Sequence, residues 1–455
     1  MFRKTGRKTA YIKAAAILSI ASLFLSSCGT FTGDESFAVS HNTVTAGEEE
    51  LSMESSPVLE YSVPRMIPGV LVDRDGYSKN EVKYALVYSE KLPEKYYVYR
   101  ADNGEQVYIG TPEEITFDEE TGKYTAKLIF ENIDEDGDYF IFADNLGSSF
   151  SFGISETCYQ DIYWNLIADE CDRISQGGTD LWETYCVLYS YERYKDVLYA
   201  LKEDAPDVLS SVGEWISRTD FDALSGADAC IGTAILFKFG YNYRSLDENM
   251  SKECIQKAAA MCKDISDAIK AAGSETLVSD ERNAYFLALA EGYRTTATGS
   301  YSTEIVSMYD YLTAGRSMYD SVYVLYGAMG YMTTKYKVDR KFCDAMMENL
   351  LFKCRDMNDD RNFLRPDMAE QADVNALLVY AQQFAAMNYI LDGYEYNEQI
   401  LNIEHFLSGR NTDGRVFDIS ENEPADAVAV YAWLAWLENN GKLDPSAPVV
   451  WNYSW

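Results

Sequence analysis

Histidine is nearly absent from this sequence, with only His41 and His405 among 455 residues. Two histidines argue against a metal centre built from several imidazoles and against a Ser-His-Asp triad. Cysteine occurs nine times, but no two cysteines have the C-x-x-C spacing of a zinc site. Apart from Cys28, the cysteines lie in apolar helical patterns and read as small buried hydrophobes. The sequence therefore predicts no metal and no cofactor.

Basic residues are also scarce, with 39 Lys and Arg against 73 Asp and Glu and a net charge of −34. This excess of negative charge argues against nucleic acid and anionic surfaces as partners. It suits a secreted protein that acts on a neutral or cationic polymer. The 36 tyrosines and 7 tryptophans offer faces that can stack on sugar rings, although tyrosine is equally a core residue.

The N-terminus has the pattern of a lipoprotein signal peptide over residues 1–28. A basic stretch precedes an apolar run, residues 14–25, which is shorter than the roughly 20 residues that span a bilayer. The stretch Leu25-Ser26-Ser27-Cys28-Gly29 resembles the bacterial lipobox, which implies lipidation at Cys28. We therefore expect a lipid anchor on the extracellular face of the bacterial cell membrane, followed by a flexible polar linker over 29–55.

The rest of the chain divides where its hydrophobic period changes. Residues 56–154 alternate with period two between turn signals such as Asn103-Gly104, which predicts an antiparallel β-sandwich. From residue 155 to 455 the apolar period is helical. Twelve amphipathic segments are expected near 157–175, 181–201, 206–219, 225–243, 251–271, 280–296, 301–314, 317–332, 339–354, 371–391, 395–409 and 424–439. Twelve helices fit an (α/α)6 barrel or a helical solenoid, and the lack of a sequence repeat favours the barrel.

Two segments near the C-terminus carry a specific signature. The first contains Leu407-Ser408-Gly409-Arg410-Asn411-Thr412-Asp413-Gly414, and the second contains Asn422-Glu423-Pro424 before an apolar helix. Together they resemble the C-terminal signature of glycoside hydrolase family 9, the inverting cellulases. The resemblance implies that Glu423 is the general acid, and we expect Arg410 to contact substrate.

Two further stretches resemble the same family. Gly104-Glu105-Gln106-Val107-Tyr108-Ile109-Gly110 and Gly137-Asp138-Tyr139 are similar to the N-terminal immunoglobulin-like domain that precedes many of its catalytic domains. The stretch Gly177-Gly178-Thr179-Asp180-Leu181-Trp182-Glu183 corresponds to the family's Gly-Gly and Asp-Ala-Gly-Asp segment. It implies that Glu183 is the base and that Asp180 helps to hold the water. We expect Trp182 and Tyr185 to bind substrate.

Each acidic residue in this set also has a purely structural interpretation. Asp180 and Glu183 have the spacing of a capping box at a helix start. Glu423 before Pro424 is likewise a helix start. The ten positions from Thr412 to Glu421 leave no room for the family's His-His-Arg substrate loop.

Two functions follow from these alternatives. The first is a surface-anchored, inverting hydrolase of β-glucan-type polysaccharide or oligosaccharide. The second is a catalytically inactive glycan-binding or scaffold lipoprotein that keeps the fold without the chemistry. A lyase on the same fold would need a Tyr/His or Tyr/Arg pair, which the shortage of histidine disfavours.

Overall fold

The computed structural model describes residues 68–201, 205–272, 278–359 and 364–444. The predicted signal peptide, the lipidation site Cys28 and the linker 29–55 lie outside the described residues. Among those residues, no helix combines the length and apolarity needed to cross a membrane.

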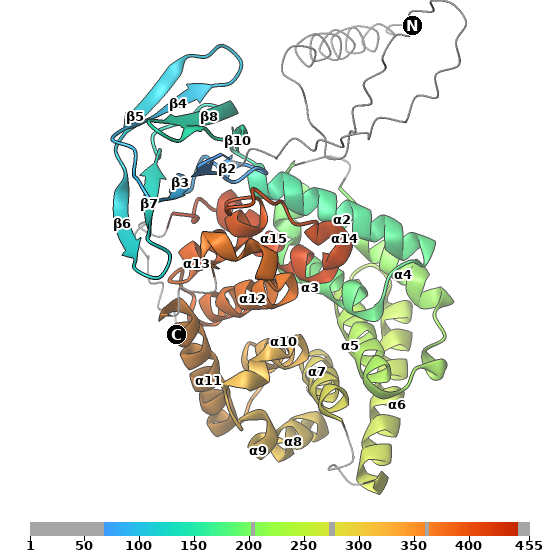
Figure 1. The fold of residues 1–455 in the computed structure, drawn as a ribbon. Coiled ribbons are helices and arrows are strands. Elements are labelled where there is room, and N and C mark those ends of the chain that lie inside the picture. Colours follow the sequence, from blue (N-terminus) through green and yellow to red (C-terminus); the bar gives the residue numbers. More distant parts are fainter. Residues whose placement is uncertain (1–67, 202–204, 273–277, 360–363, 445–455) are drawn as a thin grey trace, which may run out of the picture. The chain divides into compact units, whose positions relative to one another are not determined.

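The first part of the described chain consists of short strands packed into two sheets (Figure 1). The strands are β1 (Val70–Leu71), β2 (Tyr77–Ser78), β3 (Tyr84–Ser89), β4 (Tyr96–Arg100), β5 (Gln106–Gly110), β6 (Glu113–Asp118), β7 (Lys123–Ile129), β8 (Gly137–Ala143), β9 (Gly147–Ser148) and β10 (Phe152–Ser155). One sheet has the order β1-β3-β7-β6, and the other has the order β2-β10-β8-β4-β5 with β9 beside β8. Their alternate residues meet in one core, as the period-two pattern predicted.

The second part is helical. Its longer helices are α2 (Cys158–Gln176), α3 (Leu181–Leu201), α4 (Val208–Arg218), α5 (Gly226–Tyr243), α6 (Glu248–Ala272), α7 (Ser279–Thr296), α8 (Gly299–Ser307), α10 (Val322–Met332), α11 (Arg340–Asp359), α12 (Val374–Leu391), α13 (Asn397–Leu407) and α15 (Pro424–Asn439). Two one-turn helices, α9 (Tyr309–Leu312) and α14 (Ile419–Asn422), and the 3₁₀ turns η1 (Phe221–Ala223), η3 (Arg316–Asp320) and η5 (Pro366–Gln371) lie between them.

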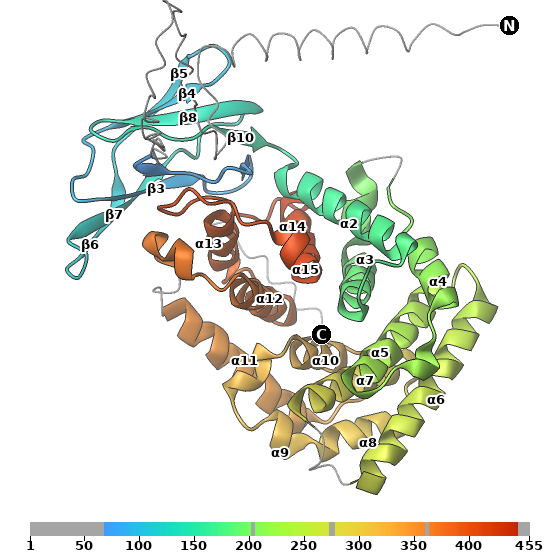
Figure 2. The same ribbon diagram turned by 45° about the vertical axis from the view of Figure 1, so that its right-hand side comes forward.

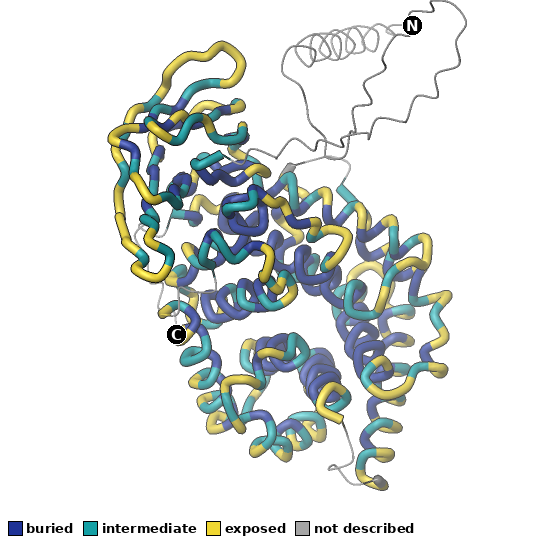
Figure 3. Tube along the Cα trace, in the orientation of Figure 1, coloured by how far each residue is buried: buried dark blue, intermediate teal, exposed yellow. Residues whose placement is uncertain are grey.

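Six of these helices form a closed inner ring. Each inner helix contacts the next one around the ring, in the order α3, α5, α7, α10, α12 and α15. The ring closes because α15 also packs against α3. Figure 2 shows α6, α8 and α11 outside this ring, and Figure 3 shows the inner helices buried along most of their length. A closed ring of six with a second helix beside each is an (α/α)6 barrel. The predicted fold class, a β-sandwich followed by this barrel, is therefore confirmed.

A buried group of four charges lies among α3, α5 and α7. The Lys238 ammonium is 2.9 Å from the Glu291 carboxylate and 3.1 Å from the Glu192 carboxylate, and Arg294 bonds to both acids. Lys238 and Glu291 are almost fully buried. Because isolated charges are costly inside a protein, each member depends on the others.

We predict that Lys238→Met destabilises the protein by about 3–5 kcal/mol, since it leaves two buried carboxylates to share Arg294. Urea denaturation of the purified variant measures this loss. Lys252→Met is the matched control, because the Lys252–Glu248 pair lies at the surface of α6. The control should leave the unfolding midpoint unchanged, and an equally small effect of Lys238→Met would contradict the prediction.

Candidate active site

A pocket of about 490 Å³ lies where five inner helices begin. Its lining comes from the first turns of α3, α7, α10, α12 and α15, from the residues just before them and, for Val379, from the second turn of α12. The lining residues are Asp180, Trp182, Glu183, Asp280, Asp320, Ser321, Val322, Tyr323, Asn375, Val379, Asn422, Glu423, Pro424, Ala425 and Asp426. The pocket therefore contains all three carboxylates that the sequence predicted as catalytic.

The pocket lining carries six carboxylates and no basic side chain among the described residues. Helix N-termini are the positive ends of the helix dipoles and expose backbone N–H groups. Acidic side chains at these positions are therefore stabilised by the helices that carry them. One of the six, Asp320, is also paired with Lys353 at 2.6 Å.

Asp180 and Glu183 form a reciprocal cap at the start of α3. The Glu183 N–H donates to Asp180 Oδ1 at 2.7 Å, and the Asp180 N–H donates to Glu183 Oε2 at 2.9 Å. The Thr179 hydroxyl donates to the same Glu183 oxygen at 2.8 Å. The structural interpretation of this pair is thus present in the fold, and both residues also line the pocket.

Glu423 occupies the junction between α14 and α15. Its N–H donates to the Ile419 carbonyl at 3.0 Å, and its own carbonyl accepts from the Ala427 N–H. Pro424 follows at the first position of α15, where a missing N–H costs nothing. The partly buried Glu423 carboxylate accepts a hydrogen bond from the Asn375 amide of α12 at 3.1 Å. Helices at two points of the ring therefore fix its position.

Asp426 is a pocket residue that the sequence analysis did not select. It lies one turn after Glu423 and is only 4% exposed. The pKa of Asp426 is raised to about 6, chiefly by burial and also by the charge of Glu423. A hydrogen bond from Gln382 lowers this pKa in part. The Gln382 amide donates to Asp426 Oδ1 at 2.9 Å, and the Tyr326 hydroxyl holds Gln382 at 2.6 Å. In the sequence, only the i, i+3 spacing from Glu423 could have indicated that Asp426 lies on the same face of the helix.

Aromatic rings form one wall of the pocket. Trp182 stacks on Tyr185 with ring centroids 5.1 Å apart and an interplanar angle of 11°. Tyr323 meets Trp182 edge-on at 5.1 Å. Tyr185 itself is fully buried, and its hydroxyl donates to Glu291 at 2.8 Å. Trp182 and Tyr323 therefore line the pocket, whereas Tyr185 does not line it and packs against the Trp182 ring.

Arg410, the other residue expected to contact substrate, lies away from this pocket. It is 3% exposed, its guanidinium lies over the Tyr84 ring at 4.4 Å, and it donates to Asn402 at 2.8 Å. The first contact reaches strand β3 of the sandwich and the second reaches α13, so Arg410 connects the two. Where it lies, Arg410 fixes the fold and does not reach the pocket that holds Glu423.

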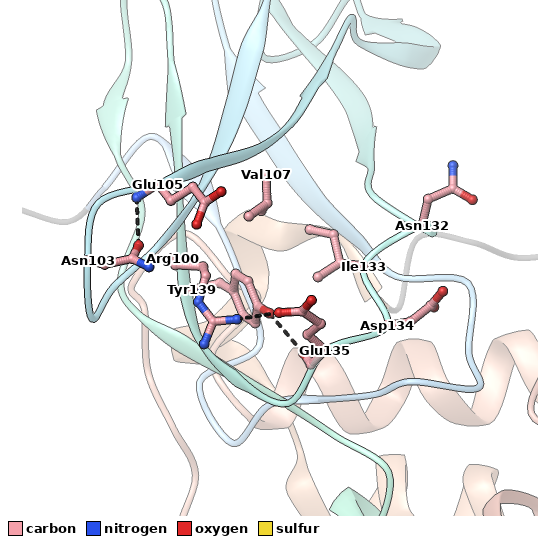
Figure 4. A pocket seen from close by; sticks show the side chains of 9 residues that line it. All are labelled: Arg100, Asn103, Glu105, Val107, Asn132, Ile133, Asp134, Glu135 and Tyr139. Carbon is pink, nitrogen blue, oxygen red and sulfur yellow. Dashed lines mark hydrogen bonds and ion pairs between the residues drawn. The ribbon is translucent and has the colours of Figure 1, made fainter.

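A second pocket, of about 480 Å³, lies on the β-sandwich (Figure 4). Its cation, Arg100, is paired with Glu135 at 2.8 Å, and the Tyr139 hydroxyl donates to the Glu135 carbonyl. Apart from Val107 in β5, the remaining side chains come from turns and loops, such as Asn103, whose side-chain oxygen accepts a hydrogen bond from the Glu105 N–H. Three acids, Glu105, Asp134 and Glu135, also line this pocket, but its lining contains no tryptophan and none of the acids that the sequence predicted as catalytic.

Among the described residues, one group of His, Cys, Asp and Glu side chains has ligand atoms close enough to share a metal ion. It consists of Asp73, Glu404 and His405, and it is buried away from the pocket. The pocket acids do not form such a group in the described part of the chain.

Comparison with known proteins agrees with this architecture. Residues 67–148 match the family described as the cellulase N-terminal ig-like domain. The chain is similar to a metagenome-derived glycoside hydrolase family 9 endoglucanase, with a TM-score of 0.58 and 14% identity over 76% of this chain and 84% of that one. The chain has the fold of the family 9 endoglucanases.

Two other family 9 structures show the same likeness. A Bacteroides ovatus GH9 structure has a TM-score of 0.55 and 13% identity over 82% of this chain and 99% of that one. AaCel9A, in complex with cellobiose-like isofagomine, has a TM-score of 0.55 and 13% identity over 76% of this chain and 83% of that one. No curated protein matches the sequence. The family 9 resemblance found in the sequence, with its immunoglobulin-like domain, is confirmed at the level of fold.

The raised pKa of Asp426 predicts a pH-dependent stability. Its pKa is about 6 in the fold and 3.8 in the unfolded chain, so the folded state binds the proton more tightly. The free energy of unfolding should therefore fall as pH rises from about 4 to above 6. An asparagine at position 426 has no charge to bury at any pH. We therefore predict that the change in the free energy of unfolding caused by Asp426→Asn is more stabilising at pH 7.5 than at pH 4, by roughly 2–3 kcal/mol.

Urea denaturation of the wild type and Asp426→Asn at the two pH values measures this difference. Glu421→Gln removes an exposed carboxylate of α14 and serves as the control, with no change in the pH slope. A stability difference between Asp426→Asn and the wild type that is the same at both pH values would refute the assignment.

Proposed function

We propose that the protein hydrolyses β-glucan-type polysaccharide or oligosaccharide by single displacement with inversion. One observation carries this proposal: Glu423 and the Asp180–Glu183 pair, about 240 residues apart in the sequence, line one pocket beside the exposed edges of Trp182 and Tyr323. An inverting glycosidase needs two carboxyl groups in one sugar-sized cavity. A similar fold, AaCel9A, is known in complex with a cellobiose-like isofagomine.

The proposed mechanism gives each carboxylate its own step. Glu423, protonated at the start, donates its proton to the leaving glycosidic oxygen while Asn375 holds its second oxygen. On the opposite face of the sugar, Glu183 accepts a proton from water, which attacks the anomeric carbon, and Asp180 helps to hold that water. An inverting reaction needs the acid and the base roughly 6.5–9.5 Å apart so that water fits between them. Trp182 and Tyr323 would stack on the sugar rings.

The buried acid Asp426 fits this mechanism as a neighbour of the proton donor. The charge of Glu423 helps to raise the pKa of Asp426, because both carboxyl groups lie in the same pocket. A carboxyl that is neutral up to about pH 6 adds no second negative charge beside Glu423 under mildly acidic conditions. We therefore expect the activity to be highest below neutral pH.

A specific observation favours the second candidate, a glycan-binding protein without catalysis. Glu183 Oε2 already accepts hydrogen bonds from the Thr179 hydroxyl and the Asp180 N–H. These bonds occupy one of the two carboxylate oxygens that a base would use to accept the proton of water. If the pair serves only as a helix cap, the pocket would still bind sugar through Trp182 and Tyr323.

We predict that Glu423→Gln lowers kcat on soluble β-glucan by at least about 10²-fold while the sugar still binds, because the amide keeps the shape but has no proton to donate. Reducing-sugar release and calorimetric binding measure the two effects. Asp320→Asn is the matched control, since it removes one charge from the same pocket at a residue paired with Lys353. Equal losses in both variants would mean that only the pocket's charge matters.

The outcome for the wild type separates the two candidate functions. Hydrolysis that Glu423→Gln abolishes supports the enzyme. Binding of a β-glucan without hydrolysis by the wild type, across a broad panel, would instead identify the glycan-binding protein.

We also propose that Cys28 carries a lipid that anchors the protein to the extracellular face of the membrane. The support is the lipobox-like Leu25-Ser26-Ser27-Cys28 and the basic and apolar segments before it. Cys28→Ser should move the protein from the membrane fraction to the soluble fraction or block processing, as seen by fractionation and immunoblotting. A mature N-terminus several residues beyond Cys28 would contradict this proposal.

A further inference from the structure

A second cluster of titratable side chains lies where the loop between β1 and β2 meets the end of α13. Asp73 comes from that loop, and Glu404 and His405 come from the last turn of α13. All three side chains are buried, with exposures of 0%, 2% and 2%. One ligand atom from each lies within 4.8 Å of the other two. The cluster therefore joins two segments more than 330 residues apart in the sequence.

Asp73 directs one oxygen into the cluster. Its Oδ1 accepts hydrogen bonds from the N–H groups of Asp75 at 2.7 Å and Gly76 at 2.9 Å. Its Oδ2 lies 2.5 Å from His405 Nδ1. The loop backbone thus fixes the carboxylate with one oxygen facing the imidazole.

Glu404 is held in the same manner. Its Oε1 accepts hydrogen bonds from the hydroxyls of Tyr431 at 3.0 Å and Ser408 at 3.1 Å. Its Oε2 lies 2.8 Å from His405 Nδ1 but accepts no hydrogen bond there. A buried carboxylate oxygen that points at a nitrogen without a hydrogen bond leaves a strong acceptor unsatisfied.

His405 faces a third carboxylate on its other side. Its Nε2 lies 4.0 Å from Glu81 Oε1, a buried oxygen that has no hydrogen-bond partner, whereas Glu81 Oε2 accepts from the Tyr159 hydroxyl at 2.6 Å. A neutral imidazole has one N–H. One proton cannot serve the carboxylates at Nδ1 and also the carboxylate at Nε2.

A cation at Nδ1 resolves the conflict at that nitrogen and frees the imidazole proton for Nε2, on the side of Glu81, which at 4.0 Å is within reach of electrostatic attraction but not of a hydrogen bond. It replaces the proton between Nδ1 and the two carboxylates, and the imidazole then carries its proton on Nε2, toward Glu81. A metal-bound histidine commonly directs its second N–H at a carboxylate in this way. The nearby guanidinium of Arg410 does not supply the missing charge by contact, because it donates to the Tyr84 carbonyl and to Asn402.

We propose that Asp73 Oδ2, Glu404 Oε2 and His405 Nδ1 bind one divalent transition-metal ion, with Zn²⁺ the best fit. One imidazole nitrogen and two carboxylate oxygens suit Zn²⁺, whereas Ca²⁺ and Mg²⁺ prefer oxygen ligands alone. Zinc bonds of 2.0–2.2 Å place tetrahedral ligands roughly 3.3 Å apart. Asp73 Oδ2 and Glu404 Oε2, now 2.5 and 2.8 Å from His405 Nδ1, would therefore each move away from that nitrogen by less than about 1 Å on binding. Glu81 is a positioning residue for the imidazole.

This metal site is structural and independent of the proposed hydrolysis. It links the first loop of the β-sandwich to the last turn of α13, whose next residues lead through Arg410 to Glu423. Bound metal should therefore raise the melting temperature of the whole described unit, because the ion binds only when both segments are in place.

The test is metal content of the full-length protein. The chain is stripped with EDTA, dialysed against a tenfold excess of Zn²⁺, passed through a desalting column and analysed by mass spectrometry of the metal. We expect about one zinc per chain in the wild type and almost none retained by His405→Gln and Asp73→Asn. His41→Gln is the matched control, because it removes the other histidine and should keep the metal.

Two further measurements keep the proposal falsifiable if a ligand variant folds poorly. Glu81→Gln retains all three ligands and should weaken zinc affinity by about 10–100-fold. X-ray absorption of the loaded wild type should show one imidazole and oxygen neighbours without sulfur. No zinc in the wild type, equal zinc in His405→Gln, unchanged affinity in Glu81→Gln or sulfur neighbours from the free cysteines would each overturn the proposal.

Discussion

The packing of α15 against α3 is the contact on which the site depends. It closes the inner ring between the first and last helices of the barrel. Because every inner helix alternates with an outer one, the inner helices begin at the same end, and the closing contact places Glu423 near Asp180 and Glu183. The amide of Asn375 and the buried chain from Tyr326 through Gln382 to Asp426 fix the α15 end of this arrangement. The ring therefore determines the site geometry more than any single loop does.

The same geometry gives the pocket acids two uses. Helix dipoles stabilise carboxylates at the N-termini whether or not they act on a substrate. The reciprocal cap of Asp180 and Glu183 and the helix start at Glu423 are therefore compatible both with a catalytic role and with a role only in stabilising the helix N-termini. What distinguishes the pocket from five ordinary helix starts is that Trp182 and Tyr323 share it, and that Asp426 is buried there with a pKa of about 6.

Periodicity and short motifs predicted the fold and part of the site. The change from period two to a helical period predicted the sandwich and the barrel, because both patterns follow from which faces are buried. The local motifs indicated Asp180, Glu183 and Glu423, which the fold brings to one pocket. The importance of Asp426 could not be predicted, since its burial and pKa arise only when α12 and α15 pack together. Arg410 belongs to a recognisable motif, but its burial against Tyr84 depends on the sandwich, which the motif does not specify.

The most direct test of the account is a crystal structure of Glu423→Gln with a soluble β-1,4-glucan oligosaccharide. We expect sugar rings against Trp182 and Tyr323, with the side chain of residue 423 within hydrogen-bond distance of a glycosidic oxygen. The Glu183 carboxylate should lie on the opposite face, within the roughly 6.5–9.5 Å that inverting hydrolysis requires. Sugar bound elsewhere, or carboxyl positions more than about 12 Å apart, would contradict it.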